Sequence, residues 1–90
     1  MRLFHAAARG NLALAKQLIG QGADLNAQDY SGSAPVHIAA ARNHLDLVVY
    51  LIELGADVNS KDGFGNTPLD VAMSSRHCSV ARILQRAGAR

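Results

Sequence analysis

Residues 29–61 read DYSGSAPVHIAAARNHLDLVVYLIELGADVNSK, and this stretch decides the fold. It begins with turn-forming residues, among which Gly32 is able to adopt a positive φ. Residues 35–42 then predict a short helix, because they start with proline, which suits the first helical position. Residues 45–54 predict a second helix with apolar side chains at helical spacing, and Gly55 lies where a glycine commonly ends a helix. The stretch therefore predicts a turn, a helix, a turn, a helix and a loop.

The same pattern recurs in register, without a gap, at an offset of 33 residues. Residues of the first copy that match the second are Ala6, Ala7, Ala8, Arg9, Leu12, Leu14, Leu18, Ile19, Gly22, Ala23, Asp24, Asn26 and Asp29. A period of 20–50 residues indicates stacked repeats that share their cores with their neighbours. We expect one all-α domain over residues 1–90, made of units at 1–28, 29–61 and 62–90.

Alanine pairs recur at the same place in successive units, at residues 6–7 and 39–40. Small side chains there allow the short helices of adjacent units to approach closely. Ala72 continues the row, and Met73 is its bulkier exception.

Two longer segments carry a resemblance to a known family. GSAPVHIAAARNHLDLVVYLIELGADVNSKD (residues 32–62) and GFGNTPLDVAMSSRHCSVARILQRAGA (residues 63–89) resemble the ankyrin repeat. The family pattern is G-x-T-P-L-H-x-A-A-x-x-G-H, then a Leu-rich helix, then G-A-D-V-N. The resemblance covers essentially the whole chain. It implies an ankyrin-repeat solenoid, an L-shaped stack of helix-turn-helix pairs with β-turn fingers that project from one edge.

The departures from the family pattern have physical consequences. Ala34 replaces the usual Thr, which should weaken that helix N-cap by about 1 kcal/mol. Thr67 and Asp70 keep the spacing of a capping box. Asn43 and Arg76 replace the glycine between the two helices, and Arg76 would be strained if its φ is positive.

The two ends of the chain resemble caps. The first unit lacks a finger, and the last has Gln85 and Arg86 where the middle unit has Ile52 and Glu53. Polar outer faces on the terminal units keep a solenoid soluble. We therefore expect one internal repeat between two capping repeats, with the GAR at residues 88–90 as the end of the second cap.

Composition limits the class of protein and its location. A net charge of +2 is too small to indicate a nucleic-acid binder by itself. The single cysteine, Cys78, excludes an intrachain disulfide and fits a reducing compartment. The first eleven residues make a poor signal peptide, and the longest apolar run, residues 47–52, is too short to span a membrane. We expect an intracellular monomer, cytoplasmic or nuclear, without a membrane span.

Catalytic and metal sites are not expected. His37, His44 and His77 occupy structural positions of the family pattern, and no Cys or carboxylate lies at metal-ligand spacing beside them. Cys78 opens the last helix, where we expect it to be a partly exposed thiol without a function. The glycines follow the repeat and form no phosphate-binding loop. We expect no enzyme activity, no cofactor and no small-molecule substrate.

The resemblance implies a module that binds one or more partner proteins through a concave face of fingers and first helices. Carried over to this chain, the finger positions are Gln28, Tyr30, Ser31, Ser33, Lys61, Gly63, Phe64 and Asn66. The corresponding first-helix positions are Arg9, Ala41, Arg42, Ser74 and Ser75.

Tyr30 and Phe64 are the strongest of these candidates, because aromatic residues and Arg dominate interface hot spots. The alternative is that each ring folds back over a neighbouring finger. Arg9 and Arg42 could form a basic ladder along the groove, or could simply complement helix C-termini in solvent.

Three alternatives remain open. Arg76, Arg82, Arg86 and Arg90 could bind nucleic acid, an anionic membrane surface or an acidic protein, although a charged terminal cap is expected anyway and no aromatics lie among them. The chain could also be a spacer or a fragment of a longer array. Asn26 and Asn59 match family asparagines that hold the loop between units and are in some cases hydroxylated; we expect the structural role.

Overall fold

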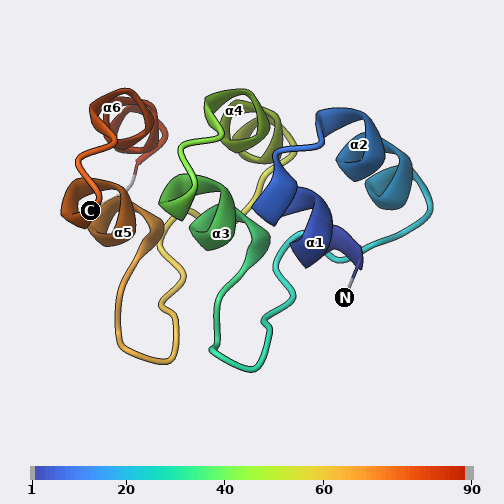
Figure 1. The fold of residues 1–90 in the computed structure, drawn as a ribbon, viewed down its shortest axis with the longest axis horizontal. Coiled ribbons are helices and arrows are strands. Elements are labelled where there is room, and N and C mark those ends of the chain that lie inside the picture. Colours follow the sequence, from blue (N-terminus) through green and yellow to red (C-terminus); the bar gives the residue numbers. More distant parts are fainter. Residues whose placement is uncertain (1, 89–90) are drawn as a thin grey trace.

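The computed structural model describes residues 2–88, and this part of the chain contains six α-helices and no strand. The helices are α1 (Arg2–Arg9), α2 (Leu12–Gly20), α3 (Pro35–Ala41), α4 (Leu45–Glu53), α5 (Pro68–Ser74) and α6 (Cys78–Arg86). Each first helix packs against the second helix of its own pair and against the first helix of the next pair. Figure 1 shows the three pairs side by side, with α1/α2 at one end and α5/α6 at the other.

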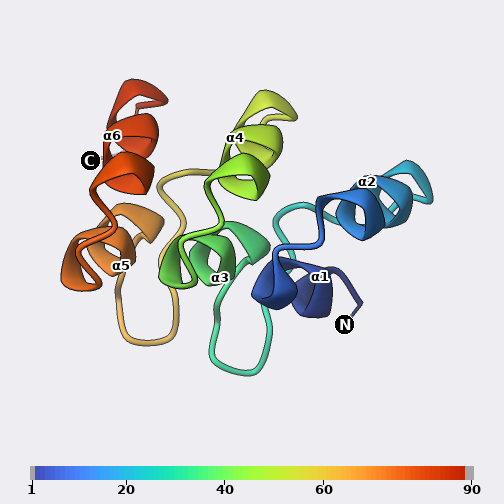
Figure 2. The ribbon, with the colours of Figure 1, turned by 45° about the horizontal axis from the view of Figure 1, so that its top comes forward.

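The helices form two layers (Figure 2), with α1, α3 and α5 in one row and α2, α4 and α6 in the other. Two loops, between α2 and α3 and between α4 and α5, project from the edge of the first row (Figure 1). These loops are the fingers that the repeat pattern predicts. The predicted all-α stack of helix pairs is confirmed.

Alanines allow the first helices to stack, as their recurrence predicts. Ala6, Ala7, Ala39, Ala40 and Ala72 are all fully buried. Met73, which follows Ala72 where the earlier copies have a second alanine, is 59% exposed on the outer side of the last pair. The second helices supply the larger core side chains, Leu47, Val48, Leu51, Val80 and Leu84.

Two of the first helices begin with the same backbone conformation but with different caps. At α5 the predicted capping box is confirmed: Thr67 Oγ1 accepts the Asp70 N–H at 3.2 Å, and Asp70 Oδ2 accepts the Thr67 N–H at 3.0 Å. At α3, Ala34 has no side-chain acceptor, but His37 Nδ1 accepts the Ala34 N–H at 3.2 Å. The substitution by alanine therefore removes one of the two bonds of the box and leaves the other.

The turns between paired helices contain the predicted backbone strain. Asn43 and Arg76 both have a φ of 60°. Gly10, at the same place in the first pair, has a φ of 67°, and a Cβ there would overlap the His44 ring. Only glycine fits at position 10, because the ring of the next repeat packs directly on its backbone.

The second helices end as predicted. The N–H groups of Gly22, Gly55 and Gly88 donate to carbonyls of the preceding helix turn at 3.0, 3.0 and 3.1 Å. Ala89 and Arg90, which complete the expected cap, lie outside the described residues. No helix between residues 2 and 88 is long and apolar enough to cross a membrane.

Candidate interaction surface

The first finger is closed by an aspartate. Asp29 Oδ1 accepts the N–H groups of Ser31 and Ser33 at 2.9 and 3.0 Å. The Asp29 backbone carbonyl also accepts the Gly32 N–H at 2.9 Å. An acceptor with two backbone donors at the base of a four-residue turn fixes its shape without help from the rest of the protein.

The second finger repeats this arrangement around Asp62. Its Oδ1 accepts the N–H groups of Phe64 and Asn66, both at 2.9 Å. Burial acts to raise the pKa of Asp62, but the backbone N–H donors of Asn66 and Phe64, with a smaller contribution from a positive charge on His37, outweigh it. The pKa of Asp62 therefore lies below its ordinary value, and the finger is held by a carboxylate.

The two fingers are joined to each other. The Gly63 N–H donates to the Ser31 carbonyl at 2.7 Å, and Gln28 Nε2 donates to the carbonyls of Gly32 and Lys61 at 3.0 and 3.2 Å. A Cβ at Gly63 would lie 2.6 Å from the Ser31 oxygen, so the backbones approach as closely as glycine permits. Gln28 and Gly63, predicted as partner-binding positions, thus also hold the two fingers together as one unit.

The aromatic residues at the tips do not pack on anything. Tyr30 is 100% exposed and Phe64 is 84% exposed. The alternative that each ring folds back over a neighbouring finger is therefore wrong for both. Two solvated aromatic rings stand on turns that are otherwise fully hydrogen-bonded.

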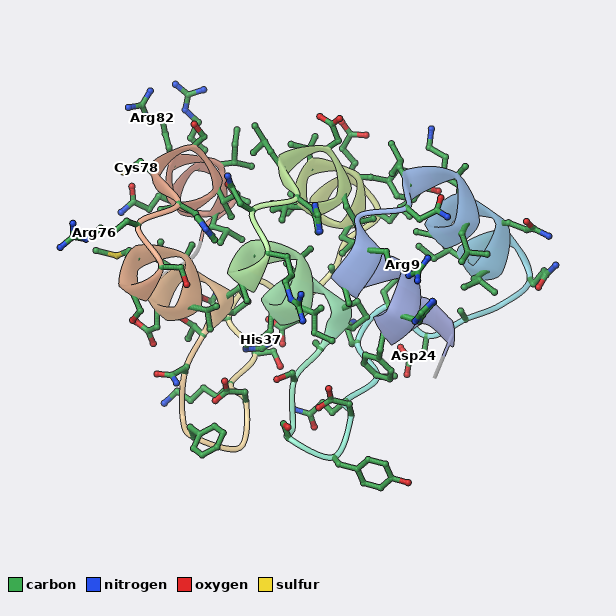
Figure 3. The ribbon with its side chains drawn as sticks, in the orientation of Figure 1. Arg9, Asp24, His37, Arg76, Cys78 and Arg82 are labelled. Carbon is green, nitrogen blue, oxygen red and sulfur yellow. The ribbon has the colours of Figure 1, made fainter. Side chains whose placement is uncertain are left out.

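The other predicted partner-binding positions also reach the surface. Ser33 is half-buried, and the exposed ones are Arg9, Gln28, Ser31, Ala41, Arg42, Lys61, Gly63, Asn66, Ser74 and Ser75. The structure brings Ser33, Ala41 and Arg42 together in a shallow depression of about 420 Å³ whose lining also includes Asp29 and Asp62. Arg9 lies at the end of α1 (Figure 3) and does not line that depression.

The histidines tie successive repeats together. One ring nitrogen of His44 lies 3.2 Å from the Ala8 carbonyl, and one of His77 lies 2.7 Å from the Ala40 carbonyl. His37 Nε2 lies 2.9 Å from the Asn66 carbonyl in the second finger. Since His37 Nδ1 accepts the Ala34 N–H, the ring carries its proton on Nε2 and donates it to Asn66. The structural role predicted for these three histidines is confirmed.

The loop asparagines have the same kind of role. Asn26 Oδ1 accepts the Asp57 N–H of the next unit at 2.8 Å, and Asn59 Nδ2 donates to the Gly88 carbonyl at 3.3 Å. The predicted function of these side chains in holding the loops is thus confirmed.

Aspartates 29 and 62 are the functional residues that sequence reasoning missed. Their recurrence at the 33-residue offset, each two residues before an aromatic or serine N–H, is a signal of an Asx turn that the pattern contained. Within residues 2–88, no three His, Cys, Asp or Glu side chains come together as a metal ion would require.

The family is decided by a comparison with models of known protein families. The model for ankyrin repeats, in three copies, matches residues 3–90. The chain belongs to the ankyrin-repeat family. No curated protein matches the chain. Ankyrin repeats are generally non-catalytic modules for protein–protein interaction, and the fingers and first helices of this ankyrin domain are the candidate surface.

A second group of candidate residues lies at the far end of this ankyrin stack. Arg76, Arg82 and Arg86 are exposed, and Arg90 lies outside the described residues. Figure 3 shows Arg76 and Arg82 projecting away from the α5/α6 pair. Cys78, at the start of α6, is an exposed free thiol as predicted.

Proposed function

We propose that this ankyrin domain is a non-catalytic adaptor that binds a partner protein through its fingers and the adjoining face of its first helices. The observation that carries the proposal is the exposure of Tyr30 and Phe64, one on each finger. Neither ring contributes to the core, so the fold does not explain why aromatic residues stand there. Aromatic side chains bury roughly 150–250 Å² each on binding and are enriched at hot spots.

The rigidity of the fingers supports the proposal. Asp29 and Asp62 each fix one turn, and Gln28 and Gly63 join the two turns. Groups that are ordered before binding lose less conformational entropy when the partner arrives. Tyr30 and Phe64 are therefore presented on a preorganised base.

The depression beside the fingers supplies the polar part of the surface. Arg42 lines it with Ser33 and Ala41, and the two finger carboxylates lie at its edge. Arg42 is exposed, so its guanidinium is available to a carboxylate or carbonyl of a partner. A partner segment that inserts between the fingers and α3 would meet apolar, cationic and hydrogen-bonding groups within one site.

The proposal is tested by affinity capture from the source cells with the wild-type domain and a Tyr30→Ala/Phe64→Ala variant. Hot-spot truncation costs about 2 kcal/mol or more, so we expect the captured partner to bind the variant at least about 30-fold more weakly. Leu54→Ala is the matched control, because Leu54 is an exposed apolar residue at the end of α4, away from the fingers. Circular dichroism must show that both variants keep the fold.

The outcome that contradicts the proposal is equal capture by the wild type and the double variant while both remain folded. A loss of capture with Leu54→Ala alone would place the interface on the second helices instead. In either case the fingers would not be the partner-binding surface.

A further inference from the structure

The outer face of the α5/α6 pair contains an apolar groove that nothing in the described chain fills. Its volume is about 400 Å³, and its floor is formed by Ala72, Met73 and Ala81. Arg76, Arg82 and Gln85 line its polar side. The groove lies at the opposite side of the last helix pair from α3 and α4 (Figure 1), so it is separate from the fingers.

The repeat shows what such a groove accepts. Met73 and Ala81 correspond, 33 positions earlier, to Ala40 and Val48, which are fully buried where α3 and α4 meet α5 and α6. The middle pair thus receives helices on this face. The last pair keeps the same helix-shaped surface, but Met73 is 59% exposed on it.

The charge of this face is one-sided. Arg76 and Arg82 stand where the middle repeat has Asn43 and Val49, and Arg86 stands where it has Glu53. No acidic residue follows Asp70 in the sequence. Asp70 itself accepts the Thr67 N–H at the finger end of α5. The groove therefore has an apolar floor and an arginine rim without acidic residues on α6.

A second copy of the chain does not complement this rim. The first 23 residues contain no Asp or Glu but include Arg2, Arg9 and Lys16, so head-to-tail stacking would place cations against cations. Two α5/α6 ends meeting each other would oppose arginines directly. A flat anionic membrane could contact the rim but could not fill a groove between two helices.

We propose that this groove binds an acidic amphipathic helix of a partner protein, at a site independent of the fingers. The apolar stripe of such a helix would cover Met73 and Ala81, as α5 and α6 cover the corresponding residues of the middle repeat. Its flanking carboxylates would pair with Arg76 and Arg82, because guanidinium groups bind carboxylates through paired hydrogen bonds. Helix-in-groove recognition of this kind uses anchors spaced three and four residues apart.

The test uses a fluorescent synthetic peptide of about five helical turns, roughly 18 residues, with Leu and Ala along one stripe and Glu on both flanks. Its binding to the whole chain is measured by fluorescence anisotropy, and the site is mapped by amide chemical-shift changes. We expect binding in the micromolar range that weakens as salt rises, with shift changes within residues 72–85. The same peptide with Gln in place of Glu should bind at least about fivefold more weakly.

Single substitutions divide the two contributions. Arg82→Glu should weaken binding at least about fivefold, and Met73→Gln should weaken it without changing the salt dependence. Lys16→Glu is the matched control, since it makes the same charge change on α2 and should leave binding unchanged. The finger substitutions at Tyr30 and Phe64 change no residue of the groove, so failure of either proposal is distinguishable from failure of the other.

Three results would overturn the inference. The Glu and Gln peptides could bind equally, Arg82→Glu could act no more strongly than Lys16→Glu, or shift changes could fall outside residues 72–85. Binding to phosphatidylserine vesicles in the absence of any binding to the peptide would show that the arginines serve a membrane surface instead.

Discussion

Ala34 and Thr67 occupy equivalent positions one repeat apart, with the same φ of −83° and ψ of 165°. Thr67 accepts the backbone N–H of the third helical residue, and Ala34 cannot. The corresponding N–H at α3 belongs to His37, whose ring accepts the Ala34 N–H in the opposite direction. A single methyl-to-hydroxyl difference therefore separates a complete capping box from half of one.

Ala34→Thr should raise the free energy of unfolding by about 1 kcal/mol, because the new hydroxyl would accept the His37 N–H. Urea denaturation followed by circular dichroism measures the change. Ala34→Val is the control, since valine has the shape of threonine but no acceptor. Equal stability of the Thr and Val variants would show that the hydroxyl makes no cap at α3.

At this scale the sequence predicted part of the result. The missing cap at Ala34 followed from the family pattern, and so did the structural role of His37. The bond from the Ala34 N–H to the His37 ring did not, because the choice of ring nitrogen depends on where the Asn66 carbonyl of the next finger lies. That position is set by stacking, which no single repeat encodes.

The finger is the element on which the proposed function depends, and its two copies are built on Asp29 and Asp62. Turn residues and glycines predicted that fingers would form. The joining of one finger to the next through Gly63 and Gln28 was not predicted, because it requires backbones 33 residues apart to meet. Short-range patterns describe the turn, whereas packing of the repeats brings the turns into contact.

The lowered pKa of Asp62 makes finger stability depend on pH. Because the folded-state pKa lies below the ordinary value of 3.8, the carboxylate stabilises the folded state above that value, and this stabilisation is lost as the pH falls through the lowered pKa. Asp62→Asn retains an oxygen acceptor but does not titrate. We expect the stability of the variant to change less than that of the wild type as the pH is lowered through this range.

Urea denaturation at a series of pH values measures this difference. Asp46→Asn provides a control, because Asp46 is an exposed carboxylate on α4, remote from the fingers. If wild type and Asp62→Asn lose stability in parallel, the hydrogen bonds from Phe64 and Asn66 do not favour the charged form of Asp62.

The whole molecule is a stack of three helix pairs with fingers along one edge and a groove at one end. Repetition at 33 residues predicted the stack, since thirteen positions of the first copy recur in the second. The end groove was not predicted. The polar residues Gln85 and Arg86 indicated a capped end, whereas Met73 and Ala81 form an apolar strip beside them that only the folded pair shows.

The proposed adaptor function is tested most directly by hydrogen exchange of the captured partner complex against the free domain. If the fingers bind the partner, backbone amides in segments 28–33 and 61–66 become protected on binding, and those of α2 and α4 keep their free exchange rates. Protection confined to the second helices, with finger amides unchanged, would contradict it.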